Sequence, residues 1–221
     1  MKVRISIAES RADVLRCQYF IAESYNDRYG IMFSEDVYDL EARIEPYPHR
    51  YIMGTVEGEI VVAMGMYTHD TYTQRYGEVT DEDIGAVLEQ AGVAEAYAGY
   101  VTHELTKLVV RRGWGRYGLA RLLHEVAHAE SFLVGDEPRP VVVTMCALVS
   151  FMEHMLAPKG RIAARFLAPF PRYPVHAKYR NDQDPMETRM TIPSLDVPDE
   201  LRQLRLPVEI ELAAPAGRGE A

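Results

Sequence analysis

Cysteine is scarce in this sequence of 221 residues, and its scarcity excludes two kinds of structural support. Only Cys17 and Cys146 are present, in apolar surroundings, and they match no disulfide framework or zinc-binding spacing. His124 and His128 are four residues apart in a predicted helix, but no third ligand accompanies them, so we predict no metal site. The two cysteines are expected to be reduced thiols in the core of a cytoplasmic protein.

Long apolar runs and an excess of basic charge are also missing. No run approaches the about 18 apolar residues of a membrane span, and the N-terminus lacks the apolar segment of a signal peptide. We therefore expect a soluble, cytoplasmic protein with no membrane span. The net charge of -9 argues against nucleic acid as a partner, because such binding needs clustered Lys and Arg.

The periodicity of apolar residues predicts one α/β domain over residues 1–212, followed by a disordered tail at 213–221. We expect helices at 10–24, 80–96, 115–132 and 150–156. Strands are expected at 2–8, at 51–67 as a hairpin turning at Glu57-Gly58, and at 101–110, 140–149 and 186–195. This order indicates a sheet that mixes antiparallel and parallel pairs.

A glycine-rich loop joins the strand at 101–110 to the next helix. Gly113, Gly115 and Gly118 allow close backbone approach there, and the first N–H groups of the following helix are suited to bind anionic oxygens. The loop lacks the Gly-Lys-Ser/Thr ending of a P-loop and the glycine spacing of a dinucleotide-binding motif. It is also compatible with a plain connection between a strand and a helix.

Three ordered motifs resemble known acyltransferases. The segment Lys107-Leu-Val-Val-Arg-Arg-Gly-Trp-Gly-Arg-Tyr-Gly-Leu-Ala120 is similar to the central loop of the GNAT superfamily, with Gly118 and Ala120 at its last two positions. Arg16-x-x-x-Phe20, Glu35-Asp36-x-x-Asp39 and Glu104-x-x-Lys107 resemble the pattern of the autoinducer (acyl-homoserine-lactone) synthases within that superfamily. The resemblance implies a GNAT-type fold: one domain with a mixed, largely antiparallel central sheet flanked by helices.

The departures from the pattern indicate the acceptor. Gly115 stands where the GNAT loop has Arg or Gln, Met66 lies near the place of an arginine that follows the hairpin in the synthases, and Lys107 replaces another. In the synthases the two arginines at the places of Met66 and Lys107 help to organise the acceptor region. The related N-acyl amino acid synthases share the architecture and the acyl-carrier donor, and we interpret the sequence as closer to them.

The resemblance implies an N-acyltransferase that moves a long acyl chain from acyl carrier protein to the amino group of an amino acid or similar small amine. Its co-substrate is an acyl-phosphopantetheine thioester, on carrier protein or CoA, and no cofactor is bound permanently. Glu104 and Lys107 are the candidate catalytic residues, with Glu104 as the base for the amine. The candidate acceptor-binding residues are Arg16, Phe20, Asp36 and Asp39. The candidate donor-binding residues are Val109 or Val110, through a backbone N–H at a strand bulge, and Arg112, Gly113, Gly115, Arg116 and Gly118.

Each candidate also has a structural interpretation. Glu104 and Lys107 would form a salt bridge only if a bulge or twist brings them to one face, since residues three apart on a regular strand face opposite sides. Phe20 is equally explained by core packing, and Asp36 and Asp39 by helix capping. The apolar residues after the fourth strand are explained by the core or, in an enzyme for long chains, by an acyl tunnel; they are Met145, Leu148, Phe151, Met152 and Met155.

Three other functions stay open at this point: an acetyl-CoA-dependent GNAT N-acetyltransferase, an acyl-homoserine-lactone synthase, and a catalytically silent acyl-binding module. The charge pattern favours the carrier-protein donor. Residues 76–106 carry seven acidic and no basic side chains, whereas residues 154–180 carry six basic and no acidic ones. We expect an acidic carrier protein to dock on a basic surface formed by Arg111, Arg112, Arg116, Lys159, Arg161 and Arg165.

Overall fold

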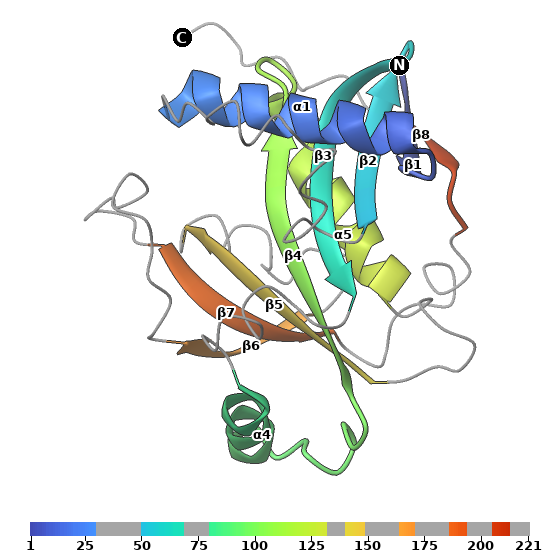
Figure 1. The fold of residues 1–221 in the computed structure, drawn as a ribbon. Coiled ribbons are helices and arrows are strands. Elements are labelled where there is room, and N and C mark those ends of the chain that lie inside the picture. The colour runs from blue at the N-terminus through green and yellow to red at the C-terminus, as the bar shows by residue number, and fades with distance from the viewer. Residues whose placement is uncertain are drawn as a thin grey trace, which may run out of the picture.

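The computed structural model describes residues 1–29, 50–68, 80–131, 140–148, 164–170, 186–193 and 205–212. They form an eight-stranded sheet of order β6-β7-β5-β4-β3-β2-β1-β8 (Figure 1). The strands are β1 (Lys2–Ile7), β2 (Arg50–Val56), β3 (Glu59–Thr68), β4 (Val101–Val110), β5 (Val141–Leu148), β6 (Ala164–Phe170), β7 (Met186–Pro193) and β8 (Val208–Glu211). The helices are α1 (Arg11–Tyr29), α4 (Asp81–Gln90), the 3₁₀ turn η1 (Gly115–Tyr117) and α5 (Leu119–Ser131).

The sheet is mixed and largely antiparallel, which confirms the predicted fold class. β4 and β5 run parallel, with Val101 opposite Val141 and Leu105 opposite Met145. The other pairs of strands between the described segments are antiparallel. The parallel pair is joined through α5, as a crossover connection requires.

Helices cover both faces of the sheet (Figure 1). On one face, Leu119 and Leu123 of α5 pack with Met66 of β3 and Leu105 of β4, and we call this group the α5 cluster. The opposite face carries two separate groups. The α1 cluster contains Cys17, Phe20 and Ile21 of α1 with the sheet residues Tyr51, Met53, Ala63 and Val109. The α4 cluster contains Ile84, Val87 and Leu88 of α4 with Val142 of β5.

For the hairpin and for α4, the residues that determine where the predicted element turns, begins or ends can be identified. The hairpin turns at Glu57-Gly58, where both residues have a positive φ of 52° and 84°, as a two-residue turn between twisted strands requires. α4 begins at a capping box, in which the Thr80 hydroxyl accepts from the Asp83 N–H and the Asp83 carboxylate accepts from the Thr80 N–H. It ends earlier than the expected residue 96, because Gly92 takes a left-handed conformation with a φ of 68°.

Other boundaries differ from the expectation. α1 continues five residues beyond Ser24, to Tyr29, and Tyr25 packs on the α1 cluster. β6 and β8 were not predicted, and the helix expected at 150–156 and the tail expected at 213–221 lie outside the described residues. None of the helices among the described segments has an apolar stretch long enough to cross a membrane.

We expect Gly54→Ala to destabilise the fold, because β2 passes close to its neighbours at this residue. A Cβ at Gly54 would lie 2.6 Å from Cγ1 of Val62 and 3.0 Å from Cδ1 of Ile5, which are both buried. Overpacking of this kind costs about 1–3 kcal/mol, measurable by urea unfolding. Gly85→Ala is the matched control: a Cβ there meets nothing within 4 Å, and removing a glycine from the interior of α4 should stabilise by about 0.5–1 kcal/mol. Equal effects of the two substitutions would contradict this account of Gly54.

Candidate active site

β4 and β5 separate part-way along their length. Among the described residues, their pairing ends at Leu105 and Met145, although β4 continues to Val110 and β5 to Leu148 (Figure 1). Beyond this point β5 stays paired with β7, as far as Leu148 opposite Met186. We call the place where the two strands separate the fork.

A bulge in β4 lies at the fork. Ala63 of β3 pairs with Val109 and Gly65 pairs with Thr106, so two residues of β4, Lys107 and Leu108, lie opposite the single residue Met64. Lys107 has a φ of 55°, in the left-handed region that residues with a side chain rarely adopt. A conformation of this kind costs about 1–3 kcal/mol, and such residues cluster at functional sites. The bulge on which a contact between Glu104 and Lys107 depends is therefore present.

A buried polar row crosses the sheet beside the bulge. It consists of Tyr67 on β3, Glu104 directly opposite on β4, and Thr144 opposite Glu104 on β5, which are 2%, 4% and 0% exposed. Met66 and Leu105 lie in the α5 cluster, so their neighbours Tyr67 and Glu104 face the other side of the sheet. On that side the row lies between the α1 cluster and the α4 cluster. A carboxylate between two apolar groups is not placed there for packing.

Lys107 and Glu104 are electrostatically coupled. Burial lowers the pKa of Lys107 from 10.5 to about 8, and the negative charge of Glu104 acts in the opposite direction, favouring the charged ammonium. The two charges therefore offset part of each other's desolvation cost. An amine with this pKa is mostly charged at pH 7 and yet gives up its proton far more readily than an ordinary lysine.

The glycine-rich loop leads from β4 into α5, but the helix begins later than expected. Residues 115–117 form a 3₁₀ turn, Gly118 takes a φ of 70°, and the first α-helical bond runs from the Leu122 N–H to the Gly118 carbonyl. The N–H of Gly118 donates to the carbonyl of Gly115 at 3.2 Å, so the role of Gly118 is conformational. The N–H groups at the start of α5 that are suited to bind an anion are therefore those of Leu119, Ala120 and Arg121. The sequence predicts the start of this helix four residues earlier, at residue 115.

The loop arginines differ in their contacts. The guanidinium of Arg111 lies 3.5 Å from a carboxylate oxygen of Glu59 and 5.6 Å from the ring centroid of Phe20. Arg116 lies over the ring of Tyr117, at 5.2 Å, and Tyr117 packs against Trp114. Arg112, Arg116 and the glycines at 113 and 115 are exposed. Of the basic surface expected from the sequence, Lys159 and Arg161 lie outside the described residues, as do the side-chain surroundings of Arg165.

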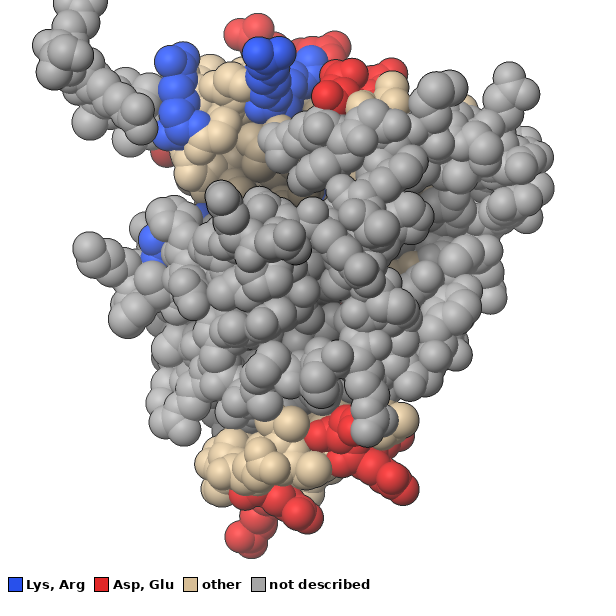
Figure 2. All heavy atoms as spheres, turned by 90° about the vertical axis from the view of Figure 1, so that its left-hand side faces the viewer, with Lys and Arg blue, Asp and Glu red and all other residues tan. Residues whose placement is uncertain are grey.

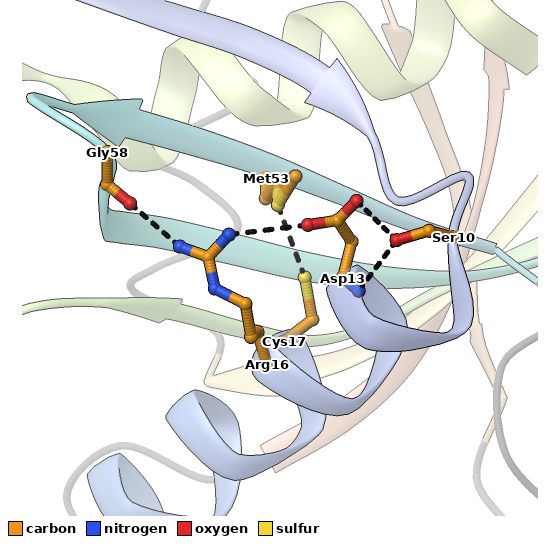
Figure 3. Close-up of polar contacts among 6 residues, drawn as sticks. All are labelled: Ser10, Asp13, Arg16, Cys17, Met53 and Gly58. Carbon is orange, nitrogen blue, oxygen red and sulfur yellow. Dashed lines mark hydrogen bonds and ion pairs between the residues drawn. The ribbon is translucent and has the colours of Figure 1, made fainter.

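Arg16 contacts the hairpin turn instead of the polar row (Figure 3). Its guanidinium donates to the Gly58 carbonyl at 2.7 Å and to the Asp13 carboxylate at 3.3 Å. It also lines a surface hollow of about 250 Å³ whose other lining residues come from β1, β2, α1, their flanking turns and the residue before β8. Because Gly58 precedes β3 and Tyr67 is near its far end, the structure does not bring Arg16 together with Glu104.

The remaining candidates are placed as follows. Phe20 is 8% exposed and packs in the α1 cluster, while Asp36 and Asp39 lie outside the described residues.

The directions of the Val109 and Val110 N–H groups follow from the pairing of β3 and β4. The Arg111 N–H donates to the Val61 carbonyl at 2.9 Å, and hydrogen bonds alternate along an antiparallel pair. The ladder therefore directs the N–H of Val109 towards Ala63 and that of Val110 away from β3.

Sequence reasoning missed Tyr67 and Thr144. Both belong to apolar segments, YIMGTVEGEIVVAMGMY and PVVVTMCALV, that were interpreted only as central strands. Their place beside Glu104 depends on the register of three strands, and no local pattern in the sequence sets that register.

No protein-family model matches the sequence, and no curated protein matches it either. Solved structures match its fold. The CoA-dependent acyl-homoserine lactone synthase BjaI, solved with MTA, aligns with a TM-score of 0.53 at 10% identity, over 90% of this chain and 87% of that one. FeeM, an N-acyl amino acid synthase from uncultured soil microbes, aligns with a TM-score of 0.50 at 10% identity, over 86% and 91%. The acyl-homoserine lactone synthase LasI aligns with a TM-score of 0.50 at 14% identity, over 87% and 90%.

The chain has the GNAT-type fold of these synthases. The resemblance inferred from the three motifs is thereby confirmed at the level of the fold. At 10–14% identity the alignments show the architecture alone, so the chemistry must be argued from the residues at the fork.

Lys107 should make the stability of the protein depend on alkaline pH. Between its folded pKa of about 8 and its ordinary value of 10.5, the unfolded chain binds one proton that the folded chain does not. The free energy of unfolding therefore rises through this range, and Lys107→Met should lose that rise. Burial raises the pKa of Cys17 from 9.0 to about 12, which lowers the stability of the protein above pH 9. Because the wild type and Lys107→Met both contain Cys17, this contribution cancels in the difference between their stabilities.

Urea unfolding of both proteins between pH 7 and pH 10.5 measures the difference. The wild type should gain stability relative to Lys107→Met as the pH rises. Lys2→Met, at an exposed position, controls for the loss of a surface charge. A difference between wild type and Lys107→Met that stays constant across the range would contradict the buried environment of Lys107.

Proposed function

We propose that this protein is an N-acyltransferase that moves an acyl group from a phosphopantetheine thioester to the amino group of an amino acid or a similar small amine. The observation that carries the proposal is the carboxylate of Glu104, buried in a polar row at the fork of β4 and β5. We further expect it to act in the cytoplasm, as the sequence composition indicates.

The donor class follows from the distance that one ligand must span. From Glu104 to Val110, the last residue of β4, the strand extends about 20 Å, at roughly 3.3 Å per residue. A donor with an anionic group at the start of α5 and a reactive carbonyl near Glu104 must therefore be long and extended. An acyl-phosphopantetheine thioester has this form, with its phosphate at one end and its carbonyl at the other.

Glu104 is suited to accept the proton of the attacking amine. A thioester is already activated, so amide formation requires mainly an unprotonated amine held close to the carbonyl carbon. A base within hydrogen-bond reach of that amine contributes roughly 10²–10⁴ in rate. The row that contains Glu104 also offers the hydroxyls of Tyr67 and Thr144 near the acceptor.

The residues around Glu104 favour an amino-acid acceptor over a sulfonium substrate. Met66, near the place of an arginine in the resembling synthases, is buried in the α5 cluster, on the opposite face from Glu104. The residue that faces the site at this place is Tyr67, a neutral phenol. FeeM, which shares the fold, is an N-acyl amino acid synthase, and this likeness supports the same assignment here.

Charge supports an acyl carrier protein as the form in which the donor arrives. Exposed acidic residues gather on α4, at the lower end of the molecule, whereas the upper end carries basic side chains beside acidic ones (Figure 2). Arg112 and Arg116 are exposed in the loop that precedes α5. An acidic carrier is therefore repelled from the α4 end and attracted to the loop, where its prosthetic group would enter.

Glu104→Gln should lower kcat/KM for acyl transfer by one to two orders of magnitude, about 10- to 100-fold, because it removes the base and keeps the shape. Turnover is followed as amide formation by mass spectrometry, with an acyl-carrier-protein thioester and a panel of amino acids and amines. Glu95→Gln, at an exposed carboxylate, is the matched control and should have no effect. Wild-type turnover by Glu104→Gln near neutral pH would exclude Glu104 as the base.

Acyl-carrier-protein thioesters should react faster than the same acyl-CoA thioesters, with an advantage that shrinks as salt is raised. Arg112→Glu with Arg116→Glu should remove this advantage and leave a slow reaction with CoA thioesters. Lys2→Glu with Arg11→Glu changes the net charge equally, away from the loop, and serves as the control. The measurement is kcat/KM for both donors across a salt series.

The same assays separate the alternatives. A salt-independent preference for acetyl-CoA would favour an N-acetyltransferase. Formation of an acyl-homoserine lactone from S-adenosylmethionine would favour the autoinducer synthase. Stoichiometric binding of the acyl chain without turnover would favour a silent acyl-binding module.

A further inference from the structure

Lys107 occupies the one bulge of β4, two residues beyond the last pair with β5. It follows Glu104 by three residues and precedes the donor-facing end of the strand. In a regular strand Lys107 and Glu104 would face opposite sides of the sheet. The extra residue removes this restriction, and the negative charge of Glu104 acts on the ammonium of Lys107.

The backbone at this place would suit a glycine, yet the sequence has a lysine. A φ of 55° costs a glycine nothing and costs a residue with a Cβ considerably more. Among the described residues, the other non-glycine residue with a positive φ is Glu57, and the two-residue turn of the hairpin requires that conformation. No turn requires it at Lys107, in the middle of a central strand. The side chain of Lys107 is therefore retained in spite of an unfavourable backbone.

We propose that Lys107 is the acid of the acyl transfer, donating the proton that the sulfur of the departing phosphopantetheine takes up. This inference rests on the proposed function. Acyl transfer from a thioester needs such a group, because collapse of the tetrahedral intermediate leaves a thiolate on the donor.

The protons balance through the pair of Glu104 and Lys107. The amine nitrogen attacks the thioester carbon, a C–N bond forms, and the proton lost by nitrogen passes to Glu104. The C–S bond then breaks with its electron pair on sulfur, and the ammonium of Lys107 gives its proton to that sulfur. The proton on Glu104 passes to the neutral Lys107, directly or through water, and both groups return to their starting state.

The acidity of Lys107 fits this step. Burial lowers its pKa to about 8, close to the value of about 8.5 for an ordinary alkyl thiol, so proton transfer between them is nearly balanced. A lysine in water is less acidic by about two pKa units, and arginine does not release its proton at all. If Lys107 were only a counter-ion for Glu104, its positive charge would be sufficient, and an arginine would supply that charge equally well.

Two substitutions separate the acid from the counter-ion. Lys107→Arg keeps the charge and removes the transferable proton. Lys107→Gly removes both, and because a glycine suits the left-handed backbone, the variant should still fold, which urea unfolding checks. With an acyl-phosphopantetheine donor, both variants should lose about 10²-fold or more in kcat.

The leaving group supplies the decisive comparison. An aryl thioester of the same acyl chain, such as the 4-nitrothiophenyl ester, releases a thiolate that needs no proton. With this donor, Lys107→Arg and Lys107→Gly should recover to within about ten-fold of the wild type, since the acid is no longer required. Glu104→Gln should stay impaired with both donors, because the amine must still lose its proton.

Wild-type kcat in Lys107→Arg with the phosphopantetheine donor would overturn the inference and leave Lys107 as a counter-ion. An equal loss with both donors in folded variants would also overturn it, and neither result affects the proposed acyl transfer. Absence of amide formation by the wild type with every donor would instead overturn the proposed function, and with it the role of Lys107.

Discussion

The single extra residue in β4 is the constraint on which the rest of the site depends. Glu104 and Val109 both face the side of the sheet covered by α1 and α4, and Leu105 and Val110 both face α5. In each pair the residues are five apart, so a regular strand would turn them to opposite faces. The bulge at Lys107 restores the apolar faces of the upper half of β4, and it does so where β5 leaves the strand. Core packing and the geometry of the fork are thus fixed by the same residue.

The fold tolerates a buried carboxylate and a partly buried ammonium that packing does not require. Removing a carboxylate or an ammonium from water costs roughly several kcal/mol per ion, before the attraction between the two is counted. An apolar residue of similar size at Glu104 would satisfy the core between the α1 and α4 clusters at lower cost. The presence of both charges at the fork, in one strained and one buried position, is most simply explained by chemistry.

The sequence predicted what depends on local patterns. The turn at Glu57-Gly58, the capping box at Thr80 and the central strands follow from residues within a few positions of one another. The sequence placed the start of α5 four residues early, because the helix-compatible stretch Gly115-Arg-Tyr ends in a left-handed Gly118. It did not reveal the polar row, since Tyr67, Glu104 and Thr144 come together only through the register of three strands. Arg16 shows the same limit: its spacing to Phe20 was recognised, but its contact with Gly58 is set by the packing of α1 on the hairpin.

The net charge of the molecule conceals an ordered distribution. An excess of acid would repel an acidic carrier if the charges were uniform, but α4 with its exposed acids and the loop with its arginines lie at opposite ends of β4 (Figure 1). Long-range attraction therefore acts at the loop, in water and subject to screening by salt. The carboxylate of Glu104 lies in a buried environment, where salt has little effect. Encounter with the donor and proton transfer are thus governed by separate charges, in the exposed loop and at the fork, which allows either to be altered without the other.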